Sequence, residues 1–202
     1  MSFILESEIL DDYLQELEEV NFSDSTIQTL IKKLFSPKQT EIEKVHIAFN
    51  FVRDDIAHSW DIQSKIVTCS ASEVLKQKQG ICYAKSNLLA ALLRSQEIPT
   101  GYCYQRLMLF DTPEKGYSLH ALNAVFIREL NKWMRLDARG NKKGVNAEFS
   151  ISEEKLAFTV NPYFDEIDYP MIYVKPNSQT IDVLKQSDNA LDMYLHNLPT
   201  KI

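Results

Sequence analysis

Hydrophobic and polar residues follow a helical period in the first half of the chain and a strand-like period from about residue 100 onward. In the first third, apolar positions recur every three or four residues over residues 9–17, 27–34 and 42–52. This spacing predicts three amphipathic helices. The segment Ser36-Pro37-Lys38-Gln39 is typical of a helix start, because serine and glutamine can form a capping box and proline suits the first helical position. We therefore expect the third helix to begin there.

Two more helices are expected between residues 70 and 96. Ser70-Ala71-Ser72-Glu73 has the form of a capping box and predicts a short helix that stops at Gly80. A long amphipathic helix then runs from Cys82 to about residue 96. Ile98-Pro99 ends it, because the residue before a proline avoids the helical conformation. Residues 57–69, which include Trp60, have neither period and are expected to form a loop.

The second half of the chain has the composition of β-strands. Residues 100–110, 119–127 and 132–137 are rich in Tyr, Phe, Leu and Val, and Glu129-Leu130-Asn131 is expected to form a hairpin turn between the last two. Further strand signals occur at 155–160 and 171–174. Ser178 is expected to cap a closing helix that continues to Tyr194. Helices followed by mostly antiparallel strands predict the α+β class.

Length and charge narrow the class of protein. The chain has 202 residues, of which 45% are hydrophobic, and this predicts one domain over residues 1–202 with one substantial core. With 22 lysine and arginine against 28 aspartate and glutamate residues, the formal net charge is −6. This charge disfavours nucleic acids and anionic membranes as partners, since both attract basic proteins. The sequence has no run of about 18 apolar residues that would predict a membrane span.

The cysteine content and the start of the chain favour a cytoplasmic protein. Residues 1–8 lack the positive and apolar regions of a secretory signal. Three cysteines are too few, and odd in number, for a disulfide framework, so reduced thiols are expected. The cysteines and His120 lack the spacing of a zinc site, and no glycine-rich phosphate loop occurs. We therefore expect no cofactor and no metal.

Cys82 has the sequence context of a nucleophile. It opens the predicted long helix, where unpaired backbone N–H groups and the positive end of the helix dipole stabilise a thiolate. The backbone N–H of Cys82 can also help to hold the oxyanion of a tetrahedral intermediate. Gly80 is expected to let the backbone turn tightly and approach a substrate closely.

His120 and Asp137 follow Cys82 in the order that thiol catalysis requires. Both lie in predicted strands, and a hairpin between these strands would bring them near each other. His120 would take the thiol proton and later return it, and Asp137 would orient the imidazole and stabilise its charged form. Each residue alone has a commoner structural explanation, as a small buried side chain, a structural histidine or a turn former. The prediction depends on the three together.

The other cysteines and histidines are interpreted as structural. They are Cys69, Cys103, His46, His58 and His196.

At these residues the chain resembles the transglutaminase-like superfamily, whose papain-related fold carries a Cys–His–Asp triad in this chain order. The matching segments lie between about residues 40 and 145. They are Phe51-Val52-Arg53-Asp54-Asp55-Ile56, Ala71-Ser72-Glu73-Val74-Leu75, Gly80-Ile81-Cys82-Tyr83-Ala84-Lys85-Ser86, Leu88-Leu89-Ala90-Ala91-Leu92-Leu93-Arg94, Ile98-Pro99, His120-Ala121-Leu122-Asn123 and Trp133-Met134-Arg135-Leu136-Asp137.

The resemblance implies a helix carrying the cysteine, packed on an antiparallel sheet or small barrel that carries the other two residues. It implies Cys82 as nucleophile, His120 as base and Asp137 as the orienting carboxylate. Animal transglutaminases use a tryptophan upstream of the cysteine as an oxyanion donor, which makes Trp60 the candidate for that role. Trp60 could equally anchor the core or a loop. The acidic clusters of their calcium sites have no counterpart in this sequence.

The resemblance therefore predicts an enzyme that acts on a protein or peptide substrate. Its reaction would be thiol-dependent acyl transfer at an amide or peptide carbonyl, through a thioester on Cys82 that an amine or water resolves. The superfamily contains cross-linking enzymes, peptidases, amidases, deamidases and inactive scaffolds. The alternative is a non-catalytic binding or scaffold module that keeps the fold.

Overall fold

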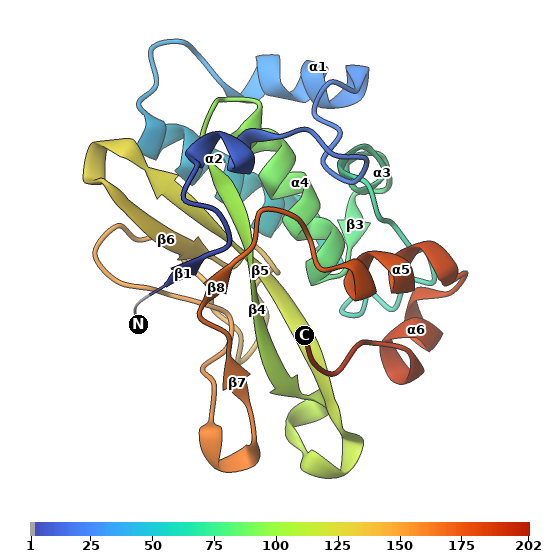
Figure 1. Ribbon diagram of the computed structural model, residues 1–202. Helices are drawn as coiled ribbons and strands as arrows, with labels where there is room; N and C mark the ends of the chain where they lie inside the picture. Colours follow the sequence, from blue (N-terminus) through green and yellow to red (C-terminus); the bar gives the residue numbers. More distant parts are fainter. Residues whose placement is uncertain (1–2) are drawn as a thin grey trace.

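The computed structural model describes residues 3–202, with an antiparallel sheet beside a group of helices (Figure 1). The main sheet has the strand order β6-β5-β4-β7. Its strands are β4 (Thr100–Met108), β5 (Tyr117–Ile127), β6 (Lys132–Leu136) and β7 (Ile167–Asp168). β4 pairs with β5 along its whole length, with Gln105 opposite His120, and β6 extends the hairpin with Asn123 opposite Leu136. These three long strands and the α+β class are confirmed.

Two short parallel pairs join distant parts of the chain. β1 (Ile4–Leu5) pairs with β8 (Met171–Ile172). β2 (Ala57–His58) pairs with β3 (Gln79–Gly80), so that His58 lies opposite Gly80. The second pair places part of the segment predicted as a loop directly beside the start of α4.

Helix α4 lies between the sheet and the helices of the first third of the chain (Figure 1). The α-helices are α1 (Ser25–Leu34), α2 (Glu41–Asp55), α3 (Ala71–Gln77), α4 (Cys82–Arg94), α5 (Ser178–Gln186) and α6 (Ala190–His196). Short 3-10 helices are η1 (Leu10–Leu14), η2 (Leu109–Asp111), η3 (Pro113–Lys115), η4 (Arg128–Leu130) and η5 (Pro162–Phe164). Across residues 3–202, none of these helices has the length and hydrophobicity needed to cross a lipid bilayer.

Helix α4 is buried on every side. The prediction that this helix is amphipathic, with a polar face exposed to solvent, is therefore wrong. All 13 of its residues are buried, so each polar side chain needs a partner inside the protein. Asn87 donates to the Cys69 carbonyl and accepts from the Tyr102 hydroxyl. Arg94 donates to the Thr100 carbonyl. These bonds fix α4 against the sheet and fix the position of its first residue, Cys82.

Two helix predictions in the first third are wrong. α2 begins after Thr40, which forms a capping box with Glu43. Ser36 and Gln39 instead close a turn before it, in which the Ser36 N–H donates to the Gln39 side chain. Residues 9–17 form only the short helix η1, because Tyr13 is fully buried and tertiary packing decides the path of this segment.

Gly80 has a different role from the predicted tight turn. The capping box of Ser70 and Glu73 is confirmed, but α3 ends because Lys78 takes a left-handed conformation with a φ of 54°. Gly80 lies in β3, where an added Cβ would be 3.0 Å from Thr68 Oγ1 and 3.1 Å from the Cβ of Ala84. A side chain at residue 80 would therefore press on the first turn of α4.

The C-terminal part also differs from the prediction. Residues 155–160 form no strand, and the closing helix is two helices, α5 and α6. Asn177, and not Ser178, caps the first, and Asn189 caps the second. The break between them lets α6 turn toward the start of α4.

Candidate active site

Cys82 is the first residue of α4, and its backbone donor is free. Ile81 precedes the helix without a side-chain cap, and the Lys85 N–H makes the first helical bond, to the Ile81 carbonyl. Within residues 3–202 the backbone N–H of Cys82 has no hydrogen-bond partner. The side chain is buried but reaches a cleft, with the residue 8% exposed. This is the environment that the sequence predicts for a nucleophile.

His120 faces Cys82 from strand β5. The Tyr83 hydroxyl donates to the Leu119 carbonyl over 2.8 Å and ties the first turn of α4 to the strand beside His120. His120 Nε2 lies 2.8 Å from Asp137 Oδ2, which leaves Nδ1 as the ring nitrogen for Cys82. The structure thus brings the three sequence-predicted residues together, and their catalytic roles stay predictions.

Asp137 is held immediately after β6 by backbone donors. Its Oδ1 accepts from the Arg139 N–H at 3.2 Å, and its Oδ2 accepts from the Ala157 N–H at 3.0 Å. Burial would raise the pKa of Asp137, but the charge of His120 and these hydrogen bonds keep it below its ordinary value. Asp137 is therefore an anion fixed in direction toward the imidazole.

The charges in this group favour a protonated His120. Burial alone would lower the pKa of His120. The negative charges of Asp137 and Cys82, together with hydrogen bonding to both, outweigh burial and raise this pKa to about 10. Near neutral pH the imidazole is therefore an imidazolium beside the sulfur. A cation in that position favours the thiolate form of a cysteine.

Cys82 and His120 line a cleft of about 700 Å³. One side is an aromatic wall, which we define as Trp60, Phe110 and Tyr194. Trp60 stacks on Tyr194 with ring centroids 4.6 Å apart and packs against Phe110 at 5.4 Å. Burial and then the charge of Cys82 raise the pKa of Tyr194 to about 12, so α6 contributes directly to the surroundings of the sulfur.

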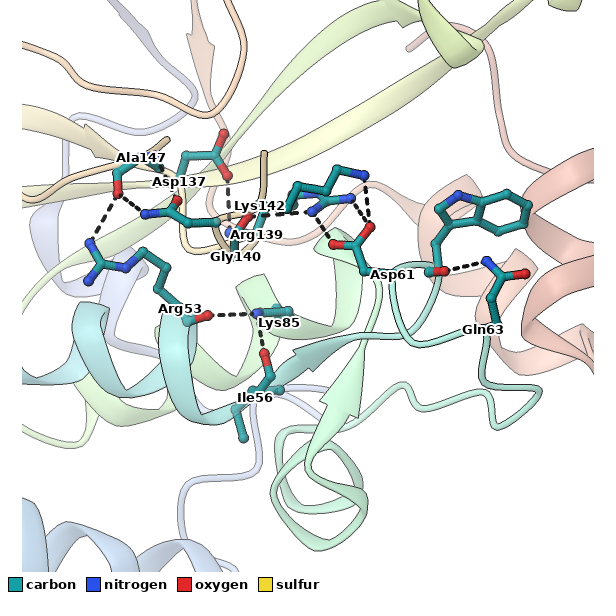
Figure 2. Close-up of polar contacts among 12 residues, drawn as sticks. Arg53, Ile56, Asp61, Gln63, Lys85, Asp137, Arg139, Gly140, Lys142 and Ala147 are labelled. Atoms are coloured by element: carbon teal, nitrogen blue, oxygen red, sulfur yellow. Dashed lines mark hydrogen bonds and ion pairs between the residues drawn. The ribbon is translucent and has the colours of Figure 1, made fainter. Parts of the chain in front are cut away.

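The cleft is also lined by basic residues, Arg139 and Lys142, which one carboxylate joins. The Asp61 carboxylate accepts hydrogen bonds from both terminal guanidinium nitrogens of Arg139, one of them at 2.9 Å, and from Lys142 Nζ at 2.8 Å (Figure 2). Arg139 is the residue whose backbone N–H binds Asp137. Asp61 belongs to the Trp60 loop, which we define as residues 59–69, so this ion pair ties that loop to the turn after Asp137.

Lys85 lies one turn after Cys82 but points away from the cleft, into the protein. Its Nζ donates to the carbonyls of Ile56 and Arg53 at the C-terminal end of α2 (Figure 2). A lysine at this position balances the negative end of the helix dipole. Burial lowers the pKa of Lys85 to about 7, and the nearby Arg139 cation lowers it in the same direction.

Sequence reasoning missed three residues of this cleft. His58 was interpreted as structural, and Arg139 and Tyr194 were given no role. The sequence offers a short-range hint for two of them: His58 directly precedes the Trp60 loop, and Arg139 follows Asp137 by two residues. Tyr194 carries none, because only the tertiary packing of α6 brings it to Cys82.

Three solved structures resemble this chain, and the one with a TM-score above 0.5 supports the same fold. A candidate cysteine protease from Cytophaga hutchinsonii is 18% identical, with a TM-score of 0.52 over 66% of this chain and 43% of its own. A candidate protease from Parabacteroides distasonis is 16% identical, with a TM-score of 0.43 over 68% of this chain and 26% of its own. A structure described as a TGase is 16% identical, with a TM-score of 0.46 over 94% of this chain and 50% of its own.

This chain therefore spans half or less of the length of those structures. No curated protein matches it. A sequence profile of the Transglutaminase-like superfamily matches residues 28–138, a segment that includes Cys82, His120 and Asp137. Because this match covers more than half of the chain, the protein belongs to the transglutaminase-like superfamily.

Proposed function

We propose that this protein is a thiol-dependent acyltransferase or amidase that acts on an amide or peptide carbonyl of a protein or peptide substrate. The observation that carries the proposal is the buried contact of 2.8 Å between His120 Nε2 and Asp137 Oδ2, on a ring that faces Cys82 in an accessible cleft. Burying a charged pair is costly, and a pair directed at a thiol in an accessible cleft favours catalysis over binding alone.

Acylation begins with the thiolate of Cys82. The sulfur attacks the carbonyl carbon, a C–S bond forms, and the π electrons of the carbonyl move to its oxygen. The free N–H of Cys82 donates to this oxyanion. When the intermediate collapses, the C–N bond breaks and the leaving nitrogen takes the proton of the His120 imidazolium. The products are an amine and a thioester on Cys82.

Deacylation uses the same residues in reverse. Water or a primary amine attacks the thioester while neutral His120 Nδ1 takes its proton. The second tetrahedral intermediate then expels the thiolate, which restores the ion pair with His120. With water the product is a carboxylic acid, and with an amine it is a new amide. The aromatic wall lies where it could shield the thioester from water, which is the condition that favours the amine.

The decisive experiment is a substrate screen read by mass. Glutamine-containing peptides are incubated with the protein, with and without a primary amine. An amine adduct identifies transfer, a gain of about one dalton identifies deamidation, and chain cleavage identifies a peptidase. Cys82→Ala should abolish turnover without unfolding the protein. Full turnover by this variant would refute the proposal.

Thiol labelling separates the enzyme from the scaffold alternative. Iodoacetamide near pH 6 should modify Cys82 selectively and rapidly, and His120→Ala should remove this selectivity. Cys69→Ala is the matched control, because Cys69 is equally buried and burial raises its pKa to about 12, with Glu19 acting in the same direction. Slow and equal labelling of all three cysteines would favour the scaffold.

A further inference from the structure

We propose that the His58 side chain donates the second hydrogen bond to the oxyanion, alongside the backbone N–H of Cys82. The inference rests on the proposed function, because an oxyanion forms only if Cys82 attacks a carbonyl. It assigns a catalytic role to a histidine that the sequence analysis interpreted as structural, in place of Trp60.

Strand pairing places His58 next to the nucleophile. His58 lies opposite Gly80 in the β2–β3 pair, and the Ser59 N–H donates to the Gly80 carbonyl at 3.2 Å. Cys82 follows Gly80 by two residues, and His58 and Cys82 both line the cleft. The His58 ring meets the Tyr194 ring edge-on, with centroids 6.1 Å apart. Tyr194 is one of the tyrosines whose pKa the Cys82 charge raises.

The His58 ring has unused hydrogen-bonding capacity. The residue is only 5% exposed, and its Nδ1 is enclosed without a hydrogen-bond partner. Among residues 3–202, its Nε2 also makes no hydrogen bond to the protein. Buried polar atoms without partners are rare and costly in native proteins. Because Nδ1 is enclosed, Nε2 is the ring nitrogen left to meet a substrate oxygen that enters the cleft during the reaction.

The electrostatic surroundings suit a neutral donor. Burial lowers the pKa of His58 well below its ordinary value, and the Arg139 cation lowers it further. The ring therefore stays neutral near pH 7 and carries one N–H. It does not compete with His120 for the proton that moves in the reaction. A fixed neutral donor at the developing oxyanion is the arrangement that stabilises a tetrahedral intermediate.

Trp60 is placed for another task. Its ring stacks on Tyr194 with an interplanar angle of 16° and packs against Phe110 at 47°. The stacked contact uses a face of the indole, and both contacts build the aromatic wall. If His58 is the side-chain donor, removing the indole N–H while keeping an aromatic ring should cost far less acylation rate than removing the imidazole.

The test compares one reaction that forms an oxyanion with one that does not. p-Nitrophenyl acetate acylates a thiolate through a tetrahedral intermediate and releases p-nitrophenolate as a burst. Iodoacetamide alkylates the same sulfur by direct displacement. His58→Phe should slow the burst about 100- to 1,000-fold and leave the alkylation rate of Cys82 within about threefold of wild type. Trp60→Phe is the comparison variant, because it removes the indole N–H and keeps an aromatic ring in the wall; its burst should stay well above that of His58→Phe.

Amide replacements show whether a hydrogen-bond donor is what matters. In His58→Gln the side-chain amide approximates the position of Nε2, and in His58→Asn that of Nδ1, so at least one should recover part of the burst rate. Circular dichroism establishes that each variant is folded.

Four results would overturn the inference. The first is a normal burst in His58→Phe, and the second is an equal loss of its burst and alkylation rates. The third is a slow burst in Trp60→Phe in place of His58→Phe. The fourth is a burst in both His58→Gln and His58→Asn that is no faster than in a slow His58→Phe. If wild-type protein is alkylated at Cys82 but is acylated neither by this ester nor by any peptide of the substrate screen, the proposed function itself fails, and this is visible before any His58 variant is made.

Discussion

Replacing Asp61 with asparagine tests the ion pair that ties the Trp60 loop to the turn after Asp137. The Arg139 side chain is only 3% exposed and that of Asp61 is 23% exposed, so the pair is largely removed from solvent. Asparagine keeps the size of the side chain but loses its charge. We expect Asp61→Asn to lower the free energy of unfolding and to slow turnover, because the same turn supplies the Arg139 N–H that holds Asp137.

The size of the effect follows from the pKa of Asp61. Burial raises this pKa, but hydrogen bonds from Arg139 and Lys142 outweigh it and lower the pKa from 3.8 to about 2. At about 1.36 kcal/mol for each tenfold change in an ionisation constant, the charged carboxylate contributes on the order of 2 kcal/mol. Leaving the Arg139 guanidinium buried without a charged partner raises the expected cost toward about 3–5 kcal/mol.

The pH dependence has a defined sign. Because the pKa of Asp61 is lower in the folded protein than in the unfolded chain, its contribution is fully present above about pH 3.8. It is lost as the pH falls toward 2. The difference in stability between wild type and Asp61→Asn should therefore be largest near neutral pH and shrink in strong acid.

Urea denaturation at several pH values measures these differences. Lys142→Met is the matched control, because Lys142 is 43% exposed and bonds the same carboxylate, and an exposed ion pair contributes less than about 1 kcal/mol. Arg139→Gln combined with Asp61→Asn should recover part of the loss. A single Asp61→Asn variant within about 0.5 kcal/mol of wild type at pH 7 would refute this reasoning.

Three further predictions follow from other contacts. Asp137→Asn removes a charge that raises the pKa of His120. The alkaline limb of the kcat/KM profile should therefore move to lower pH, and turnover should fall about 10²–10⁴-fold. An unchanged pH profile would contradict this prediction. Lys85 has a pKa of about 7 in the folded protein against 10.5 ordinarily, so between these pH values the unfolded chain binds more protons and stability should rise with pH. Between pH 7 and 10 the free energy of unfolding, measured with urea, should rise by on the order of 3 kcal/mol more in wild type than in Lys85→Met. An equal rise in both proteins would exclude the buried lysine as its source. In Gly101→Ala the new Cβ would lie 2.5 Å from Ile172 Cγ2 and 2.9 Å from the Tyr173 carbonyl oxygen. This clash should lower the free energy of unfolding by about 1–3 kcal/mol, measured by thermal denaturation. A melting temperature equal to that of wild type would show that β8 shifts freely.

The sequence was most informative where local pattern and tertiary structure agree. The strands near residues 100–108, 117–127 and 132–136 carry strong strand composition and a hairpin turn, and they form as expected. The order of Cys82, His120 and Asp137, each in the expected kind of element, predicts that they meet, and their catalytic roles stay predictions. The N-cap at Thr40 was missed because two consecutive segments, Ser36–Gln39 and Thr40–Glu43, both have capping-box form. The second has glutamates in the first turn, which the helix dipole favours.

The rest of the site depends on contacts between segments far apart in sequence. The β2–β3 pair has only two residues per strand, too few for any period to reveal. Asp61 and Arg139 are 78 residues apart, and Tyr194 reaches the cleft only because α6 turns away from α5. Such contacts are set by packing, so residue spacing along one chain could not predict them.

The charges around His120 explain how one imidazole can serve both halves of the proposed reaction. Asp137 stays negative throughout, since His120 and two backbone N–H groups hold its pKa low. The charge on Cys82 exists only while the sulfur is a thiolate, and it disappears when the thioester forms. Because that charge is one of the two that raise the pKa of His120 to about 10, acylation lowers the pKa of the imidazole. The ring is therefore charged when the leaving amine needs a proton, and it stays neutral when the attacking water or amine must lose one. This change requires no movement of the ring, so a rigid, buried pair of His120 and Asp137 is sufficient for the complete cycle.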